Sequence, residues 1–222
     1  MRNIAIVAFL FVAHFSQAQF SIGVRGGIIN ASFNYSELAA GQSSSERLGL
    51  IGGLLAEFRL NEGFAIQPEV NYVQRGDKKT SVFTLPFISN IETTNEVRIN
   101  YLEIPVMLKG GFKVGPARLD LLAGPSLSLA MSGTDKTKIV TTNLITNTTS
   151  EESYTEDLDF EQDIQKSDVN LQGGAMLSFA LGGSRFFVDG RYIYGLTNLS
   201  KTDEVEITNR GVSLTAGLFF GF

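Results

Sequence analysis

Apolar and polar residues alternate with a period of two along eight stretches of this chain. The alternation is clearest in residues 211–222, where aliphatic and aromatic residues take the even positions, and Gly, Ser and Thr take the odd positions apart from Phe219. Successive side chains of a β-strand point to opposite faces, so this pattern predicts a strand with one apolar face and one small, polar face. The predicted strands cover residues 20–29, 47–60, 64–75, 97–109, 117–131, 168–181, 185–196 and 211–222.

The predicted strands are joined alternately by short turns and by long polar segments. The short connections are residues 61–63, 110–116 and 182–184, and the long ones are residues 30–46, 76–96, 132–167 and 197–210. Short periplasmic turns and long extracellular loops are typical of an outer-membrane barrel. We therefore predict an all-β fold, an eight-stranded antiparallel up-and-down transmembrane β-barrel with both chain ends on the periplasmic side.

A soluble β-sandwich or a lipocalin-like barrel would share this alternation but would turn its apolar face inward. Its outward face would then favour Lys, Glu and Thr, whereas the polar faces here are rich in Gly. The chain also ends on Phe222, which suits a lipid-facing rim better than a surface in water. A hydrophobic content of 43% and a mean hydropathy of +0.09 agree with a barrel in which every second residue faces a polar interior. These observations favour the membrane barrel.

The N-terminal residues have the organisation of a secretory signal peptide. Arg2 precedes a mostly apolar segment, residues 4–15, and Ser16-Gln17-Ala18 fits a small-x-small cleavage site. A membrane anchor is the alternative, but a spanning helix needs about 20 apolar residues. We predict a signal peptide over residues 1–18, a barrel domain over residues 19–222, and a location in the outer membrane of a Gram-negative bacterium.

Composition argues against several kinds of chemistry. The net charge is −5, whereas a nucleic-acid partner would need a basic surface. The chain has no cysteine, and its single histidine, His14, lies in the predicted signal peptide. The usual pairs of nucleophile and base are therefore missing from the predicted mature chain. We predict that the protein is not an enzyme, and we assign no cofactor and no catalytic, cofactor-binding or metal-binding residue.

Charged residues recur on the polar faces of successive predicted strands. They are Arg25, Glu57, Arg59, Glu69, Glu103, Lys109, Arg118, Asp120, Asp189 and Arg191. Eight strands enclose an interior just wide enough for side chains, and unpaired buried charges are costly. We predict that these residues form an ion-pair network that closes the lumen. The alternative is a narrow channel for small solutes across the outer membrane, lined by the same charges.

The long segment 132–167 is rich in Thr in its first half and acidic in its second half. Its acidic residues are Glu151, Glu152, Glu156, Asp157, Asp159, Glu161 and Asp163. Clustered carboxylates can bind Ca²⁺ or bridge to lipopolysaccharide through divalent cations, but the spacing of an EF-hand loop is missing. We favour a solvated extracellular loop and leave the cation site open.

Several motifs resemble the PorT-like outer-membrane β-barrel family of Bacteroidetes-type bacteria. The similar segments are residues 21–27, 66–76 with a QPE motif, 101–109 with a YLEIP motif, 123–126 and 191–198. The resemblance extends over nearly the whole predicted mature chain and implies a single eight-stranded barrel. No residues here match the secretion and gliding activity of the family's namesake, so the resemblance implies no specific role.

The end of the chain resembles the C-terminal β-signal of bacterial outer-membrane proteins in Thr215, Gly217, Phe220 and Phe222. This resemblance implies that the barrel-assembly machinery is a partner during biogenesis. Outer-membrane lipid and lipopolysaccharide are further expected partners, together with an envelope protein. We predict a structural or interaction role at the cell envelope, with the narrow channel as the alternative.

Overall fold

The computed structural model describes residues 19–36, 42–160, 164–201 and 206–221. The predicted signal peptide, residues 1–18, lies outside the described residues. The strands in this part of the chain are β1 (Gln19–Tyr35), β2 (Gln42–Arg59), β3 (Phe64–Leu85), β4 (Ser89–Val114), β5 (Ala117–Asn143), β6 (Thr148–Asp157), β7 (Ser167–Leu181), β8 (Ser184–Gly195) and β9 (Ile207–Gly221). Over the same residues, no helix is both long enough and apolar enough to cross a membrane.

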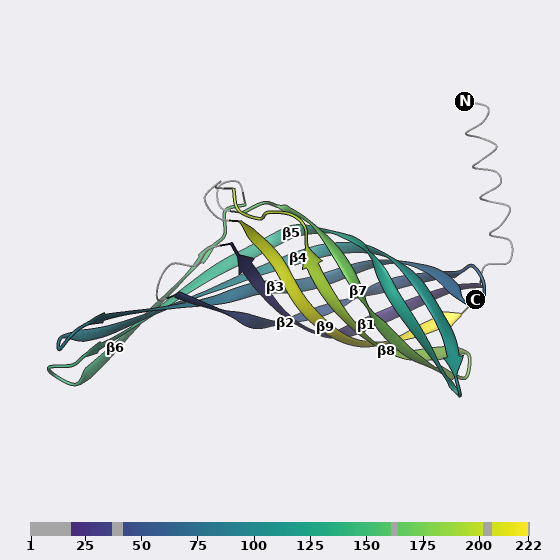
Figure 1. Ribbon diagram of the computed structural model, residues 1–222, viewed down its shortest axis with the longest axis horizontal. Coiled ribbons are helices and arrows are strands. Elements are labelled where there is room, and N and C mark those ends of the chain that lie inside the picture. The colour runs from purple at the N-terminus through teal and green to yellow at the C-terminus, as the bar shows by residue number, and fades with distance from the viewer. Residues whose placement is uncertain (1–18, 37–41, 161–163, 202–205, 222) are drawn as a thin grey trace, which may run out of the picture.

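Eight of these strands close a ring (Figure 1). Neighbouring strands are hydrogen-bonded in the order β4-β3-β2-β1-β9-β8-β7-β5, and β4 also pairs with β5. β1 and β9 meet antiparallel, with Ser21 opposite Gly221. The predicted eight-stranded antiparallel up-and-down barrel is therefore confirmed. β6 is an additional strand, which pairs with the second half of β5 beyond the ring.

Three segments predicted as polar loops are largely strand. β3 and β4 continue to a turn at residues 86–88, and β5 and β6 form a second hairpin around residues 144–147. β1 continues to Tyr35, and β2 begins at Gln42. The prediction of loops over most of 30–46, 76–96 and 132–167 is therefore wrong. In these extensions the strands are still paired by backbone hydrogen bonds, but their side chains no longer alternate between lumen and lipid. The alternation of apolar and polar residues therefore did not reveal them.

The extensions form a projecting sheet, which we call the stalk (residues 42–46, 76–98 and 132–157). It leaves the barrel at the end opposite to the short turns (Figure 1). Irregularities in register lie near its base, between Glu46 and Ile51 in β2 and between Asn100 and Tyr101 in β4. Such irregularities bend a strand and break its period of two. They explain why the predicted strands start or end close to these positions.

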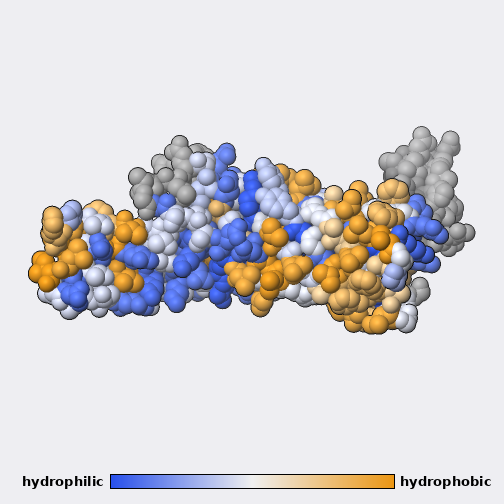
Figure 2. Space-filling view, turned by 60° about the horizontal axis from the view of Figure 1, so that its bottom comes forward, coloured by the Kyte–Doolittle hydropathy of each residue, from blue (hydrophilic) through white to orange (hydrophobic). Residues whose placement is uncertain are grey.

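The outer surface of the barrel is apolar. Outward side chains such as Leu54, Leu108, Leu121 and Leu214 are each more than half exposed. Figure 2 shows an apolar belt over the short-turn half of the molecule, a hydrophilic zone beside it, and a second apolar area at the far end of the stalk. A barrel in lipid needs an apolar band of this kind.

Apolar layers fill the barrel between its charged groups. Each layer is a cluster of side chains that are at most 5% exposed. The first contains Leu55, Met107, Leu122, Met176, Phe187 and Phe219; the second contains Ile29, Ala31, Ile51, Val73 and Ile193; the third, at the stalk end, contains Phe33, Ile99, Tyr101, Ala130 and Leu199. The interior is therefore filled by apolar packing as well as by charge, a feature that the sequence analysis did not predict.

Phe219, which interrupts the polar face of the last strand, belongs to the first apolar layer. Its ring lies 4.9 Å from the ring of Phe187, measured between centroids. A Cβ atom at Gly217 would lie 2.5 Å from Cζ of Phe187 and 2.1 Å from the carbonyl oxygen of Val24. The absence of a side chain at Gly217 therefore makes room for the Phe187 ring. This packing gives a physical reason for a small residue at this position of the polar face.

Candidate functional site

A central charged layer joins strands on opposite sides of the ring. Arg25 on β1 contacts Glu69 on β3 at 2.9 Å and Asp189 on β8 at 3.7 Å. Arg191 on β8 contacts the same two carboxylates at 2.8 and 2.5 Å. All four side chains are at most 1% exposed. Two cations and two anions therefore neutralise each other in the middle of the barrel.

Neutral amides add hydrogen bonds to this central layer. Gln67 donates to one oxygen of Glu69 at 2.6 Å, and Asn71 donates to the other at 3.0 Å. Asn71 also accepts a hydrogen bond from Nε of Arg25 at 3.2 Å. A buried carboxylate whose lone pairs are occupied in this way can remain ionised. The polar residues of the QPE motif thus belong to the central layer.

A second charged layer lies nearer to the stalk. Arg75 on β3 is hydrogen-bonded to Glu103 on β4, and its guanidinium lies 3.6 Å from the carboxylate of Asp168 on β7. Ser128 and Gln172 donate to the two oxygens of Glu103 at 3.1 and 3.0 Å. The glutamate of the YLEIP motif therefore occupies the same kind of position as Glu69, as a shared acceptor in the interior.

A third charged layer lies near the short turns. Glu57 on β2 contacts Lys109 on β4 at 2.6 Å, Arg59 at 2.8 Å and Arg185 on β8 at 2.6 Å. The Nζ atom of Lys109 and the guanidinium of Arg185 also lie over the ring of Phe219, at 5.3 and 4.7 Å from its centroid. The cations of the third charged layer therefore pack against the first apolar layer.

Asp120 on β5 completes the third layer. It accepts a hydrogen bond from Nε of Arg118 at 2.8 Å and lies 3.9 Å from Nζ of Lys109. Arg118 also donates to the backbone carbonyl of Glu62 at 2.8 Å. The structure thus distributes the ten charged residues singled out in the sequence over three layers, each joining several strands.

Three further charged residues of these layers were missing from the predicted set. Arg75 and Asp168 lie at the ends of predicted strands, and Arg185 is the first residue of another. The period of two predicts that these side chains also face the interior. Arg75 continues the inward series of Glu69 and Asn71, and Arg185 precedes Asp189 by an even number of positions. The predicted set left these strand ends out.

The residues that resemble a β-signal fall on two faces of β9. Thr215 is 2% exposed and faces the interior, as does Gly217, whereas Phe220 is 42% exposed on the outer surface. Phe222 lies outside the described residues. In the last barrel strand, the polar residue Thr215 of the β-signal therefore faces the interior, and the aromatic residue Phe220 faces outward.

Polar groups connect β-strands at the junction of barrel and stalk. Tyr35 donates to Asp77 at 3.0 Å, and burial together with this carboxylate raises the pKa of Tyr35. Nε of Arg47 donates to Glu96 at 2.8 Å. This hydrogen bond is the main reason that the pKa of Glu96 lies below its usual value, while partial burial acts in the opposite direction.

The acidic part of segment 132–167 is mostly an exposed strand. Glu151, Glu152, Glu156 and Asp157 lie on β6, and Glu151 contacts Lys138 on β5 at 2.9 Å. Within the described residues, no group of three or more potential ligands is arranged to hold a metal ion. Glu161 and Asp163 lie outside the described residues.

The tip of the stalk is apolar. Phe83, Phe87 and Ile145 are 60%, 90% and 73% exposed. The two hairpins are joined there, because the N–H of Leu144 donates to the carbonyl of Ile88 at 2.8 Å. Phe87 has a φ of 61°, a left-handed conformation that bulky residues rarely adopt. The tip therefore presents an aromatic ring to solvent on a strained turn.

Comparison with known proteins gives a family and a set of similar structures. The profile of the family described as outer membrane protein beta-barrel domain matches residues 15–201. The outer membrane protease OmpT from Escherichia coli is similar over 92% of this chain and 97% of its own, with 11% identity and a TM-score of 0.50.

Two other similar structures have lower TM-scores. Neisserial surface protein A is 16% identical, and the match covers 91% of this chain and 97% of that one with a TM-score of 0.44. OprG from Pseudomonas aeruginosa is 11% identical, with coverages of 94% and 98% and a TM-score of 0.45. Comparison with curated proteins gives no match. At these identities, the likeness to OmpT bears on the fold alone.

Proposed function

Because the chain belongs to the outer membrane protein beta-barrel domain family, we propose that it acts as a closed outer-membrane barrel that presents an interaction surface on its stalk. The observation that carries this proposal is the contrast between a filled interior and an exposed apolar tip. Met107, Phe187 and Phe219 are at most 1% exposed within the barrel, whereas Phe87 is 90% exposed at the tip. The proposed role is one of structure and binding, without transport.

The order of inward residues along β4 supports a closed lumen. From the short-turn end, Lys109 is followed by Met107, Glu103, Tyr101 and Ile99, all of which are at most 2% exposed. A hydrated ion would have to separate ion pairs and then pass apolar layers, both of which oppose conduction. The narrow channel remains the alternative that the experiment must be able to detect.

Conductance of the refolded barrel in planar lipid bilayers tests closure. We expect no steady single-channel openings from the unsubstituted protein. Steady openings whose conductance changes in the Glu69→Gln or Arg118→Gln variant would contradict the closed lumen, because they would place the charge network on an ion path. Lys78→Gln is the matched control, since Lys78 is exposed on the stalk.

The shape and composition of the stalk support an interaction role. The stalk carries apolar side chains at the position farthest from the apolar belt, with a hydrophilic zone between the two (Figure 2). Exposed apolar patches outside a lipid-facing band mark contact sites with a partner. We propose that the partner is an envelope or surface protein with a complementary apolar site.

Site-specific photocrosslinking in cells tests this binding role. A photoreactive residue at Ile145 should give one defined protein adduct, and the Phe87→Gly change should remove the adduct, because the aromatic ring is lost while glycine accepts the positive φ. A photoreactive residue at Leu121, which lies on the lipid-facing belt, is the control. An adduct that persists at full yield in Phe87→Gly would contradict binding through the tip.

The proposal also includes the PorT-like family, a non-enzymatic role, and the surroundings and assembly partner of the barrel. The QPE and YLEIP motifs support membership of the PorT-like family, and they supply the acceptors Glu69 and Glu103. The absence of cysteine, and the position of His14 in the predicted signal peptide, support a non-enzymatic role. Lipopolysaccharide and outer-membrane lipid are the proposed surroundings, and the barrel-assembly machinery is the proposed partner during insertion.

A further inference from the structure

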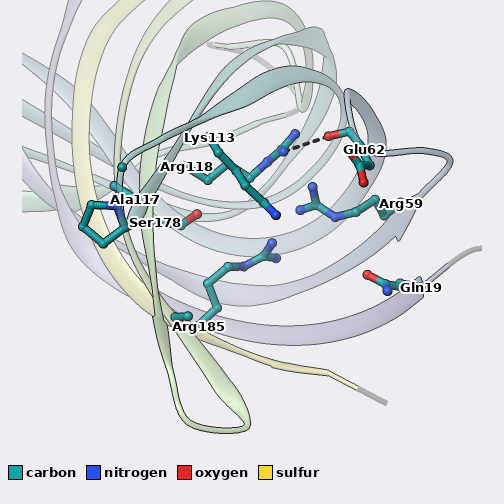
Figure 3. A pocket seen from close by; sticks show the side chains of 11 residues that line it. Gln19, Arg59, Glu62, Lys113, Ala117, Arg118, Ser178 and Arg185 are labelled. Atoms are coloured by element: carbon teal, nitrogen blue, oxygen red, sulfur yellow. Dashed lines mark hydrogen bonds between the residues drawn. The ribbon is translucent and has the colours of Figure 1, made fainter.

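A pocket of about 380 Å³ opens at the short-turn end of the barrel. Four cationic side chains from four different strands line it: Arg59 on β2, Lys113 on β4, Arg118 on β5 and Arg185 on β8. Figure 3 shows their charged ends directed towards a common space. This end of an outer-membrane barrel faces the periplasm, so the pocket is accessible without passage through the closed layers.

The carboxylates near these cations are too few to satisfy them. Glu57 alone is shared by Arg59, Arg185 and Lys109. A guanidinium has five N–H donors and an ammonium has three, whereas a carboxylate has only two oxygens. The buried Nε of Arg185 has no hydrogen-bond partner in the described part of the chain. Lys113 forms no ion pair with any described residue.

The net charge around the pocket is positive. The cations are Arg59, Lys109, Lys113, Arg118 and Arg185, and the acids are Glu57, Glu62 and Asp120. Five cations against three acids leave a surplus of two positive charges. The central layer, by contrast, contains equal numbers of cations and anions, so the surplus is specific to the short-turn end.

A buried hydroxyl group in the same pocket also lacks a partner. Ser178 is 2% exposed, and its Oγ has no hydrogen-bond partner among the described residues. Its oxygen points into the space between the cations in Figure 3. Buried hydroxyl groups in folded proteins are nearly always hydrogen-bonded. A ligand that brings hydrogen-bond acceptors into the pocket would supply the missing partner.

We propose that this pocket binds a phosphate group from the periplasmic side. A phosphate monoester carries a charge of about −1.5 to −2 and three strong acceptor oxygens, which matches the surplus of two positive charges. Guanidinium groups bind phosphate through two parallel hydrogen bonds, and a lysine adds a point charge. The group reaches the pocket either as free phosphate or a small phosphomonoester, or as the headgroup of a lipid. This assignment is independent of the role proposed for the stalk.

Titration of the refolded barrel in an uncharged detergent with inorganic phosphate, followed by ³¹P NMR line width, tests the proposal. We expect saturable binding that weakens as KCl is added. Ser178→Ala should weaken binding about fivefold, because one hydrogen bond is lost. Lys113→Gln should weaken it by up to about fivefold, since an exposed charge contributes less.

The matched controls are Ser213→Ala, a buried serine on β9 that does not line the pocket, and Lys78→Gln on the stalk. Both should bind phosphate like the unsubstituted protein. Migration of unboiled samples during electrophoresis checks that each variant is folded. Absence of saturable binding, or equal affinity in Ser178→Ala, Lys113→Gln and their controls, would overturn the proposal.

A second arm of the titration distinguishes the two sources of the phosphate group. The barrel is placed in nanodiscs of phosphatidylcholine, with or without phosphatidic acid, a lipid whose headgroup is a phosphate monoester. If phosphatidic acid prevents the binding of inorganic phosphate to the unsubstituted protein, the pocket holds a lipid headgroup. If phosphate binds equally in both nanodiscs, the ligand is a soluble phosphate.

Discussion

The barrel and the stalk are built from the same continuous strands, but they bury their side chains differently. On β3, Glu69 and Arg75 are 2% and 1% exposed, whereas Val82 and Phe83 further along the strand are 55% and 60% exposed. Both faces of the strand therefore meet solvent in the outer part of the stalk. The backbone ladder is common to both regions, so the packed interior is what distinguishes them.

This difference has consequences for stability. Regions with few buried contacts open locally at a lower free-energy cost than a packed core. A change to a buried charge in the barrel should therefore destabilise the whole fold. A comparable change in the stalk should act locally or not at all.

The largest effect is expected from Glu69→Ala in the central layer. The change removes the carboxylate that is shared by Arg25 and Arg191 and leaves Asp189 as their acidic partner. Breaking a buried ion pair on one side costs about 3–5 kcal/mol. The free energy of unfolding in urea measures this cost. Glu151→Ala removes an exposed stalk pair and should cost less than about 1 kcal/mol; equal costs in the two variants would contradict the contrast.

A smaller loss of stability is expected from Gly217→Ala, which adds one methyl group next to the ring of Phe187. The added Cβ would lie 2.5 Å from the ring and 2.1 Å from the carbonyl oxygen of Val24, so neighbouring atoms must shift. Overpacking of this kind costs about 1–3 kcal/mol. Urea unfolding of Gly26→Ala is the control, because a Cβ there meets no atom within 4 Å. Similar stabilities of the two variants would show that the packing of Phe187 is not tight.

Phe87→Gly should leave the stability within about 1 kcal/mol of the unsubstituted protein. Relief of the left-handed conformation favours the folded state, and the greater freedom of glycine in the unfolded chain opposes it. Thermal unfolding followed by circular dichroism measures the result. A loss comparable to that of Glu69→Ala would mean that the stalk tip supports the fold, which would contradict the separation of the two regions.

The smallest effect is expected from acidification of the stalk. Arg47 lowers the pKa of Glu96, so this pair stabilises the fold at neutral pH. The stabilisation should be lost as the pH falls below the usual pKa of glutamate and through the lowered value. Because the side chain of Glu96 is 37% exposed, we expect the loss of this ion pair to lower the stability by about 0.2–1 kcal/mol. Hydrogen exchange of residues 94–98, corrected for the intrinsic effect of pH on exchange, measures the loss. Arg47→Gln should reduce the pH dependence of this protection, because Arg98 and Lys136 still act on Glu96.

Much of the barrel was predictable because lipid and lumen impose a strict period of two. Val212 and Leu214 alternate with Ser213 and Thr215, and the structure places them on the outer and inner faces respectively. The same alternation predicted ten charged residues on the inward faces. It also contained Arg75 and Arg185, which the predicted set omitted.

The stalk could not be predicted in the same way. Its strands have exposed side chains on both faces, and register irregularities separate it from the barrel. Polar residues such as Thr142 and Thr149, which look like a solvated loop in sequence, are paired across β5 and β6. Pairing between distant segments depends on backbone hydrogen bonds, which leave no periodic trace in an exposed sheet.

The sequence by itself determined the class of fold, the number of barrel strands and the charged character of the inward faces, because alternation marks each strand and short and long connections separate one strand from the next. Only the tertiary structure decided which charges meet. Glu69 and Arg191 are far apart in the chain, and their contact depends on closure of the ring. Closure also gathers Arg59, Lys113, Arg118 and Arg185 around one pocket. Such gathering depends on strand order and stagger, which residue types along one strand do not encode.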